Sequence, residues 1–197
     1  MKTLIAAALI VTLAGASPSH AQEQQTFIFK LYGGLFFPSN EKFHDLYNSN
    51  SEAIWGVGVS LPLGNFVFLD GDVGFFRASA FIDPQIDSSA ALEENIIHIG
   101  LLHKQQIGRL LFFRATAGVN YILLKQKYTS PGSPDVSIDS DKKLGYYAGV
   151  GIERMVESGQ ASLYSDFMYD YRRSHQKELE GDFGGFRLIL GIHIFLF

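Results

Sequence analysis

Apolar residues alternate with glycine or polar residues through eight separate blocks of this chain. A period of two places successive side chains on opposite faces of a β-strand, so each block predicts a strand with two unlike faces. No block beyond the N-terminal segment shows the period of about 3.6 residues that an amphipathic helix requires. The blocks cover residues 26–37, 52–63, 65–78, 94–104, 110–125, 143–155, 160–172 and 184–197.

The connections between these blocks alternate between long and short. The long ones are "PSNEKFHDLYNSNS", "SAFIDPQIDSSAALE", "QKYTSPGSPDVSIDSD" and "RSHQKELEGD", and the short ones are "PLGN", "QQIG" and "VESG". A chain of strands that runs up and down produces this order when tight turns lie at one end and long loops at the other. This is the layout of an outer-membrane barrel, in which short turns face the periplasm and long loops face outward.

The two faces of the strands differ in side-chain size. In the third block Leu69, Val73 and Phe75 share one face, whereas Asp70 and Asp72 share the other. Glycine weakens strands and is uncommon on water-facing surfaces, but a face of glycine and single charges fits the narrow lumen of an eight-stranded barrel. The apolar face then points outward, where lipid rather than water must cover it. Closure of the barrel meets the second requirement of a membrane, because it leaves no backbone amide unpaired.

The sequence therefore predicts an all-β fold, an eight-stranded antiparallel up-and-down transmembrane β-barrel. A soluble periplasmic barrel that binds a small apolar ligand has the same period with its apolar side chains inward, and it remains the alternative. No segment after the N-terminal region approaches the roughly 18 consecutive apolar residues of a transmembrane helix, so a helical membrane protein is excluded.

The N-terminus has the features of a secretory signal peptide. Lys2 precedes an apolar segment from Leu4 to Ala14, and Ser19-His20-Ala21 forms a small-x-small cleavage site. The apolar segment is too short for a permanent membrane anchor. We therefore predict a cleaved signal peptide at residues 1–21 and an outer-membrane β-barrel domain at residues 22–197.

Composition excludes several other classes of protein. The chain has no cysteine, so a lipid anchor after the cleavage site and a disulfide framework are both excluded. The formal net charge is −4, with 16 basic and 20 acidic residues, and loss of Lys2 with the signal peptide makes the mature chain more acidic. This balance does not favour an anionic partner, so we expect no contact with nucleic acid.

Charged residues of inward parity form the first candidate site. Each charge in a narrow lumen needs a partner, because an unpaired buried ion is costly. We interpret these residues as a structural ion-pair network that fills the barrel, and a selective ion path is the alternative. The predicted members are Asp70, Asp72, Arg114, Glu153, Asp166, Asp170 and Arg187.

Catalysis by the barrel is the second possibility, because several barrels of this size are enzymes that act on lipid A. A lipid A deacylase of this type resembles a His-x-Ser pair on one strand, and none of the mature histidines is followed two residues later by Ser. A palmitoyl-transfer type places His, Asp and Ser at the outer rim, for which His44, His175, Asp87 and Ser88 are the available residues. We predict no catalytic residue, since such loops are usually only solvated.

Metal and cofactor motifs are incomplete. The segment "DVSIDSDKK" supplies Asp135, Asp139 and Asp141, but it lacks the D-x-D-x-D-G core and the closing Glu of a calcium loop. The "GVG" at residues 149–151 lacks the third glycine and the helix of a dinucleotide site. We therefore predict no metal and no cofactor.

With these features assembled, the chain resembles the small outer-membrane β-barrel proteins of the OmpA/OmpX type, within the broad outer membrane protein β-barrel domain family. The segments "KLYGGLFFPSN" and "WGVGVSLPLGNFVFLDGDVGFF" carry the likeness. The resemblance implies contact with outer-membrane lipid and lipopolysaccharide. It also implies that the barrel assembly machinery recognises the C-terminal strand.

Phe195 and Phe197 are the residues to which the resemblance assigns the assembly signal. They share the parity of Arg187, whereas this family usually places its terminal aromatic residue on the outer face. A bulge near Gly191, or an apolar periplasmic end of the lumen, would reconcile the two.

The leading functional hypothesis is a non-enzymatic outer-membrane barrel whose external loops serve surface binding, adhesion or envelope integrity through an unidentified external ligand. A lipid-A-modifying enzyme or a narrow transporter on the same barrel is the second hypothesis. The soluble periplasmic ligand-binding barrel is the third.

Overall fold

The fold is described from a computed structural model. It describes residues 27–39, 51–83, 88–129, 136–139, 143–171, 173–174, 181–182 and 184–196. The predicted signal peptide and Phe197 lie outside these residues.

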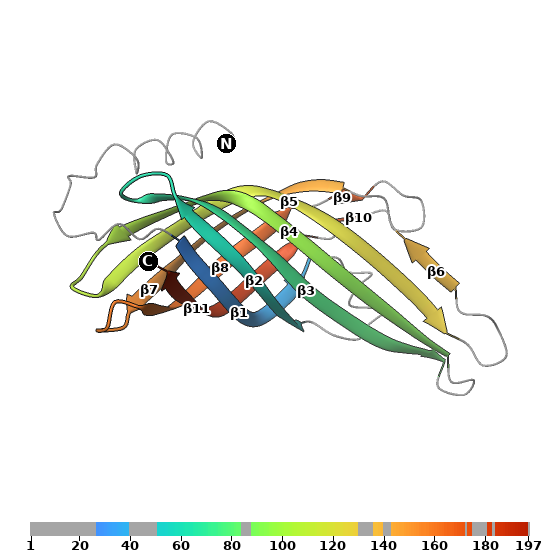
Figure 1. The fold of residues 1–197 in the computed structure, drawn as a ribbon. Coiled ribbons are helices and arrows are strands. Elements are labelled where there is room, and N and C mark those ends of the chain that lie inside the picture. Colours follow the sequence, from blue (N-terminus) through green and yellow to red (C-terminus); the bar gives the residue numbers. More distant parts are fainter. Residues whose placement is uncertain are drawn as a thin grey trace.

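Eight long strands close into one antiparallel barrel (Figure 1). They are β1 (Phe27–Pro38), β2 (Glu52–Pro62), β3 (Val67–Asp83), β4 (Ser88–Gln106), β5 (Leu111–Thr129), β7 (Lys143–Met155), β8 (Ala161–Tyr171) and β11 (Gly185–Leu196). The short strands are β6 (Val136–Asp139), β9 (Arg173–Ser174) and β10 (Gly181–Asp182). The predicted all-β, eight-stranded antiparallel up-and-down barrel is confirmed.

The last long strand pairs with the first to close the ring. The β1–β11 register runs without a shift from Phe27↔Leu196 to Pro38↔Gly185. No bulge therefore interrupts β11 at Gly191. Within the described part of the chain, no helix is long and apolar enough to cross a membrane.

The two ends of the barrel differ. Residues 63–66, 107–110 and 156–160 form short turns at one end, which we call the short-turn end. The other end, the long-loop end, carries the predicted long connections. Both described chain ends, at Phe27 and Leu196, pair with each other at the short-turn end.

The predicted loop at residues 79–93 is largely strand, which corrects the boundaries of the third and fourth blocks. β3 continues to Asp83 and β4 begins at Ser88, and their register is continuous apart from a shift between Phe81 and Asp83. The predicted loop at residues 126–141 likewise contains the end of β5 and all of β6. Small residues such as Ala and Ser weaken the apolar alternation here, but backbone pairing does not require it.

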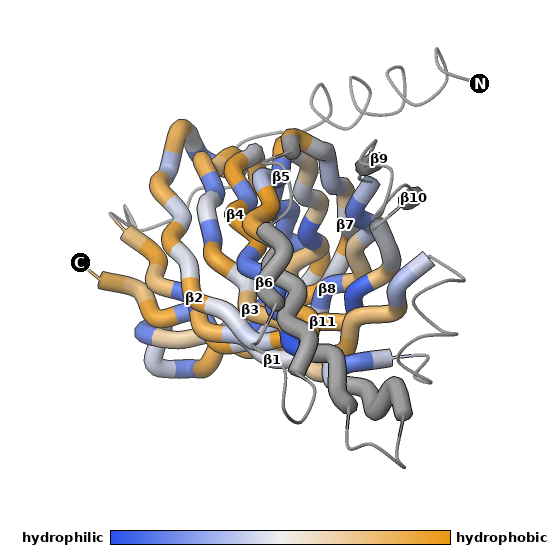
Figure 2. Tube along the Cα trace, turned by 90° about the vertical axis from the view of Figure 1, so that its right-hand side faces the viewer, coloured by the Kyte–Doolittle hydropathy of each residue, from blue (hydrophilic) through white to orange (hydrophobic). Residues whose placement is uncertain are grey.

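The apolar face of the strands points outward. Large hydrophobic side chains are exposed on all eight long strands, among them Leu144 at 71%, Leu190 at 64% and Leu163 at 58%. The inward face is buried and includes many charged side chains, so hydropathy alternates along the coloured parts of the long strands in Figure 2. This orientation is opposite to that of a soluble ligand-binding barrel, whose apolar side chains line the interior.

Inward glycines make room for large aromatic side chains. A Cβ atom at Gly56 would lie 2.3 Å from Cζ of Tyr32, and one at Gly191 would lie 2.4 Å from Cζ of Tyr164. These tyrosine rings therefore lie directly against the backbone of neighbouring strands. The glycines of the inward face thus allow a narrow barrel to hold tyrosine side chains.

Two adjacent glycines of β1 allow a test of the closing seam. A Cβ atom at Gly34 would lie 2.1 Å from the backbone oxygen of Leu188, whereas one at Gly33 would meet only the oxygen of Ile54 at 3.8 Å. We predict that Gly34→Ala lowers the free energy of unfolding by about 1–3 kcal/mol, because a backbone contact cannot yield without moving β11. Urea unfolding of the refolded barrel measures this change. Gly33→Ala is the matched control and should have little effect, and equal effects of the two substitutions would contradict the prediction.

Candidate functional site

Buried apolar side chains gather at both ends of the lumen, with the buried Glu94 among those at the long-loop end, and the ion pairs lie between the two ends. The apolar layer at the long-loop end consists of Phe36, Ile54, Phe76, Ala78, Leu92, Ile96 and Ile122. The layer at the short-turn end consists of Ile28, Phe68, Leu102 and Phe195, with Met155 packed against it. These layers enclose two groups of ion pairs, which we call the central cluster and the short-turn cluster.

Asp72 and Asp170 organise the central cluster. The Lys30 ammonium lies 2.9 Å from Oδ2 of Asp72, and Tyr32 donates its hydroxyl hydrogen to Oδ1 of Asp72 at 2.8 Å. Nε of Arg187 lies 2.6 Å from Oδ2 of Asp170. The side chain of His98 lies between the two carboxylates, with Nδ1 2.9 Å from Asp72 and Nε2 3.1 Å from Asp170. One imidazole thus bridges strands on opposite parts of the wall.

Two further side chains complete the central cluster. The amide of Asn120 donates to Oδ1 of Asp170 at 2.8 Å, and the ammonium of Lys30 also pairs with Asp70 at 2.5 Å. Nη2 of Arg187 lies 2.9 Å from Nε2 of His98. Nε2 of His98 thus lies within contact distance of both the guanidinium of Arg187 and the carboxylate of Asp170.

Glu153 organises the short-turn cluster. Its carboxylate lies 3.0 Å from the ammonium of Lys104 and 2.9 Å from Nη1 of Arg114. The second guanidinium nitrogen, Nη2, pairs with Asp166 at 3.0 Å. His193 contacts the same carboxylate through Nδ1 at 3.1 Å. Every member of this group is buried, so each charged group has lost its hydrating water and interacts with its ion-pair partners instead.

Aromatic rings hold the cations of this cluster from the sides. The guanidinium of Arg114 lies over the ring of Tyr164 with its carbon 4.2 Å from the ring centre. The ammonium of Lys104 lies 5.2 Å from the ring centre of Phe68 and 5.5 Å from that of Phe195. Such cation–π contacts stabilise the charged form of Arg114 and Lys104, and they are stronger for a cation that is removed from water.

The structure brings all seven predicted charged residues into the lumen and distributes them over the two clusters. Asp70, Asp72, Asp170 and Arg187 lie in the central cluster, and Arg114, Glu153 and Asp166 lie in the short-turn cluster. The predicted network omitted four members that share the same inward parity, namely Lys30, His98, Lys104 and His193. Applying the parity rule to every strand would have found them.

The predicted assembly-signal residues lie in and just after the last strand. The side chain of Phe195 is 3% exposed and packs inside the lumen, as its shared parity with Arg187 requires. The apolar layer at the short-turn end accounts for this position without a bulge. Phe197 lies outside the described residues.

A serine, a histidine and a carboxylate meet in the short-turn cluster, but their geometry does not suit nucleophilic catalysis. Ser162 donates its hydroxyl hydrogen to Oε1 of Glu153 at 2.5 Å, and His193 contacts that same oxygen. A catalytic serine would instead donate to the histidine. All three side chains are at most 1% exposed, so no substrate reaches them in this arrangement.

The remaining sequence candidates contribute no site in the described part of the chain. Only the backbone is described for Ser88, in β4, and for Asp139, in β6. The glycines at 149–151 lie within β7 rather than in a loop. No group of His, Asp or Glu side chains suited to a metal ion occurs among the described residues. The candidates outside those residues are His44, His175, Asp87, Asp135 and Asp141.

Comparison with known proteins identifies the fold. No family model matches the chain, and no curated protein matches it in sequence. Among solved structures, a major outer membrane protein from Thermus thermophilus is similar with a TM-score of 0.59, at 16% identity over 86% of this chain and 99% of that one.

Two further structures have the same architecture. The N-terminal β-barrel domain of Pseudomonas aeruginosa OprF has a TM-score of 0.57, at 12% identity over 88% of this chain and 98% of that one. Ail, the attachment invasion locus protein of Yersinia pestis, has a TM-score of 0.54, at 12% identity over 85% of this chain and 95% of that one. The chain therefore has the fold of the small eight-stranded outer-membrane β-barrels.

The ion pairs of the lumen make a quantitative prediction. We expect Arg187→Met to lower the free energy of unfolding by about 3–5 kcal/mol, because it leaves the buried carboxylate of Asp170 without its cation. Arg77→Met is the control, since Arg77 pairs with Glu93 at 3.9 Å with both side chains more than half exposed. That change should stay within about 0.5 kcal/mol. Urea titration of both variants in detergent measures the difference, and equal losses would refute the structural role of Arg187.

Proposed function

We propose that this protein is an integral outer-membrane barrel without enzymatic activity, and that it binds external partners through its long-loop end. The exposed apolar face supports the membrane location, because only lipid makes a belt of large outward hydrophobic side chains stable. β1, β2, β8 and β11 have 11 or 12 residues each, close to the roughly 9–11 that a tilted transmembrane strand requires. The likeness of the fold to outer-membrane barrels supports the same location.

The content of the lumen supports a structural role for the barrel wall. Apolar layers lie beyond the ion pairs at both ends, and the cations and carboxylates between them contact one another. A conducting path would need charges that face water. The same burial leaves Ser162 and His193 without access to a lipid substrate, so neither an enzyme nor a transporter is favoured.

The observation that carries the binding proposal is the length of three neighbouring strands. β3, β4 and β5 have 17, 19 and 19 residues, so they extend past the other strands at the long-loop end (Figure 1). β6 continues this sheet by pairing with residues 125–128 of β5. The four strands form a projecting sheet outside the span of the shorter strands.

The projecting sheet has a free edge among the described residues. The last pair between β2 and β3 is Ile54↔Phe76, whereas β3 continues to Asp83 with β4 on its other side. Within the described ranges, no strand pairs with residues 77–83 on the side away from β4. A free edge of this kind pairs with an extended segment of another protein by adding a strand to the sheet. We propose this mode of binding for the external ligand.

The remaining parts of the proposal concern biogenesis. Residues 1–21 would direct export and be removed, and the C-terminal strand with Phe195 and Phe197 would be recognised by the barrel assembly machinery. Lipid and lipopolysaccharide would then surround the outward face.

The membrane location predicts a definite behaviour in extraction. The mature protein should stay in the outer-membrane fraction after washing with salt and carbonate and should require detergent for release. Unheated samples should migrate at a different position from boiled samples, because a closed barrel resists unfolding by dodecyl sulfate. A mature protein that is fully soluble in the periplasmic fraction would contradict the proposal.

Trimming the projecting sheet tests the binding role separately. Ser79 and Ala91 are register partners, so replacing residues 80–90 with Asn-Gly rejoins β3 and β4 through a two-residue hairpin. We expect the trimmed barrel to keep its heat-dependent migration and to lose binding to peptides that a phage-displayed library selects on the intact barrel in nanodiscs. Equal binding by the trimmed barrel, or no selection on the intact one, would refute the binding role.

A further inference from the structure

The free edge of β3, residues 77–83, begins where the outward face of this strand turns polar. On that face Phe75 stacks on Trp55 with ring centres 4.4 Å apart. Two residues later Arg77 pairs with Glu93 on β4, and both of these side chains are more than half exposed. An exposed ion pair at this level places the free edge in water rather than in lipid.

The sequence of the free edge is complementary to itself in charge. It reads RASAFID, with the basic Arg77 first, the acidic Asp83 last and no charge between them. When this segment pairs antiparallel with an identical segment about Ala80, positions at equal distances on either side of Ala80 lie opposite each other. Arg77 of each copy then stands opposite Asp83 of the other, and opposite charges at such positions stabilise an antiparallel pair. Only the backbone is described for Asp83, and its place in this pairing follows from its position along β3.

The middle of the free edge also suits this pairing. Ala80 stands opposite its own counterpart, where the Cα atoms of two opposed residues come within about 4.5–5.5 Å of each other. Alanine is small enough for either end of this range. The register of β3 with β4 shifts only between Phe81 and Asp83, so the strand is regularly paired on its other side through the centre of the free edge.

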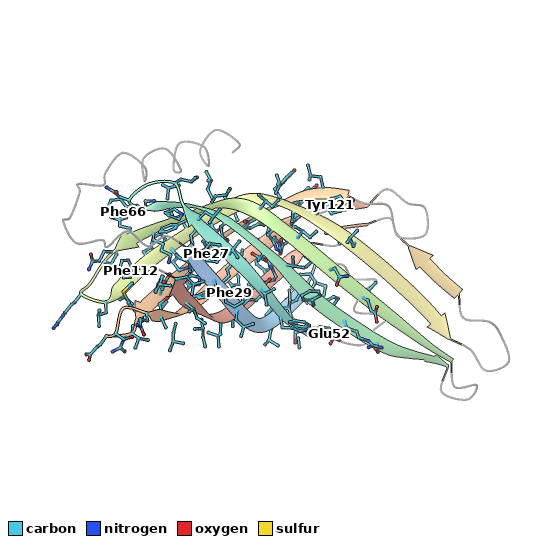
Figure 3. All side chains as sticks on the ribbon, viewed as in Figure 1. Phe27, Phe29, Glu52, Phe66, Phe112 and Tyr121 are labelled. Atoms are coloured by element: carbon cyan, nitrogen blue, oxygen red, sulfur yellow. The ribbon has the colours of Figure 1, made fainter. Side chains whose placement is uncertain are left out.

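The direction of β3 determines where the second copy lies. The strand runs from the short turn at residues 63–66 toward the long-loop end, and Figure 3 labels Phe66 near its start and Glu52 at the start of the neighbouring β2. Two identical antiparallel neighbours in one sheet are related by a two-fold axis perpendicular to that sheet. Because the wall of an inserted barrel stands across the membrane, this axis lies close to the membrane plane. Rotation about it inverts the second barrel, which therefore belongs to a facing membrane.

A second copy in the same membrane does not fit the charge pattern. Its β3 would run in the same direction, so the two free edges would pair in parallel and Arg77 would lie beside Arg77. Like charges at neighbouring positions destabilise a strand pair. The pattern therefore favours a contact between two membranes.

We propose that the free edge pairs with the free edge of a second copy in a facing outer membrane, and that one continuous sheet thereby links two cells. The inference rests on the proposed binding role of this edge and names its partner. One pair of short edges is a small contact and is weak alone. Many copies on two apposed membranes act together, which raises the strength of adhesion through avidity.

Vesicle clustering tests the proposal. Phospholipid vesicles that hold many copies of the intact barrel are prepared in two colours and mixed, and two-colour coincidence measures the vesicles that are joined. We expect clusters of both colours with the intact barrel, and none with the trimmed barrel in which Asn-Gly replaces residues 80–90. Equal clustering by the trimmed barrel would exclude the free edge as the contact.

Charge reversal tests the register of the pair. Arg77→Glu and Asp83→Arg each place like charges at both ends of the pair, so we expect clustering to fall at least about fivefold when all vesicles carry the same variant. Mixing vesicles of one variant with vesicles of the other places opposite charges at both ends again. Clustering should then return, and only between vesicles of unlike colour, which a misfolded variant could not produce. If clustering does not return in the mixture, the antiparallel pairing about Ala80 is wrong.

Glu93→Gln is the matched control for Arg77→Glu. It removes the ion pair of Arg77 within the barrel without changing the free edge, so this variant should cluster vesicles as the intact barrel does. A loss as large as that of Arg77→Glu would show that the ion pair within the barrel, and not the second copy, accounts for the effect. A barrel that binds selected peptides at the free edge but never joins vesicles would overturn the second copy as partner and leave the binding role in place.

Discussion

The pairing of β1 with β11 is the contact on which the rest of the structure depends. A sheet that closes on itself has no edge within the barrel, so every strand of the wall has a partner on both sides. Closure also encloses the inward face, which converts its charged side chains from solvated groups into buried ones. The ion pairs of the lumen are therefore a requirement that closure creates. The continuous register from Phe27↔Leu196 to Pro38↔Gly185 both completes the pairing of the wall strands and encloses the inward face.

Sequence periodicity predicted the wall of the barrel well and its projections poorly. Leu69 and Asp70 could be assigned to opposite faces because a narrow lumen and a lipid exterior impose contrary demands on neighbouring residues. Residues 79–93 show little such contrast, because Ala and Ser are frequent there, and this composition was read as a loop. A strand outside the membrane is specified by backbone pairing, which leaves little trace in hydropathy.

The charged site was predicted in part because the parity rule was applied to only part of the wall. Lys30 and Lys104 lie about as near to strand ends as Asp70 and Arg187 and face inward like them, but the predicted network included no residue of β1 or β4. Phe195 presented the reverse difficulty. An aromatic residue of inward parity conflicted with a charged lumen only while the lumen was treated as uniform, and the layered order of apolar, charged and apolar side chains removes the conflict.

The last strand supplies cationic or imidazole partners to both charge clusters. Arg187 pairs with Asp170, and His193 contacts Glu153, yet both carboxylates belong to strands that are synthesised earlier. A chain that ends before β11 would leave Asp170 without its guanidinium partner and Glu153 without its histidine contact, and it would also lack its seam. Loss of the last strand would thus destabilise the barrel in two ways, through an open sheet edge and through buried negative charge that has lost its partners. A barrel of this sequence can therefore become stable only after its last strand has been synthesised.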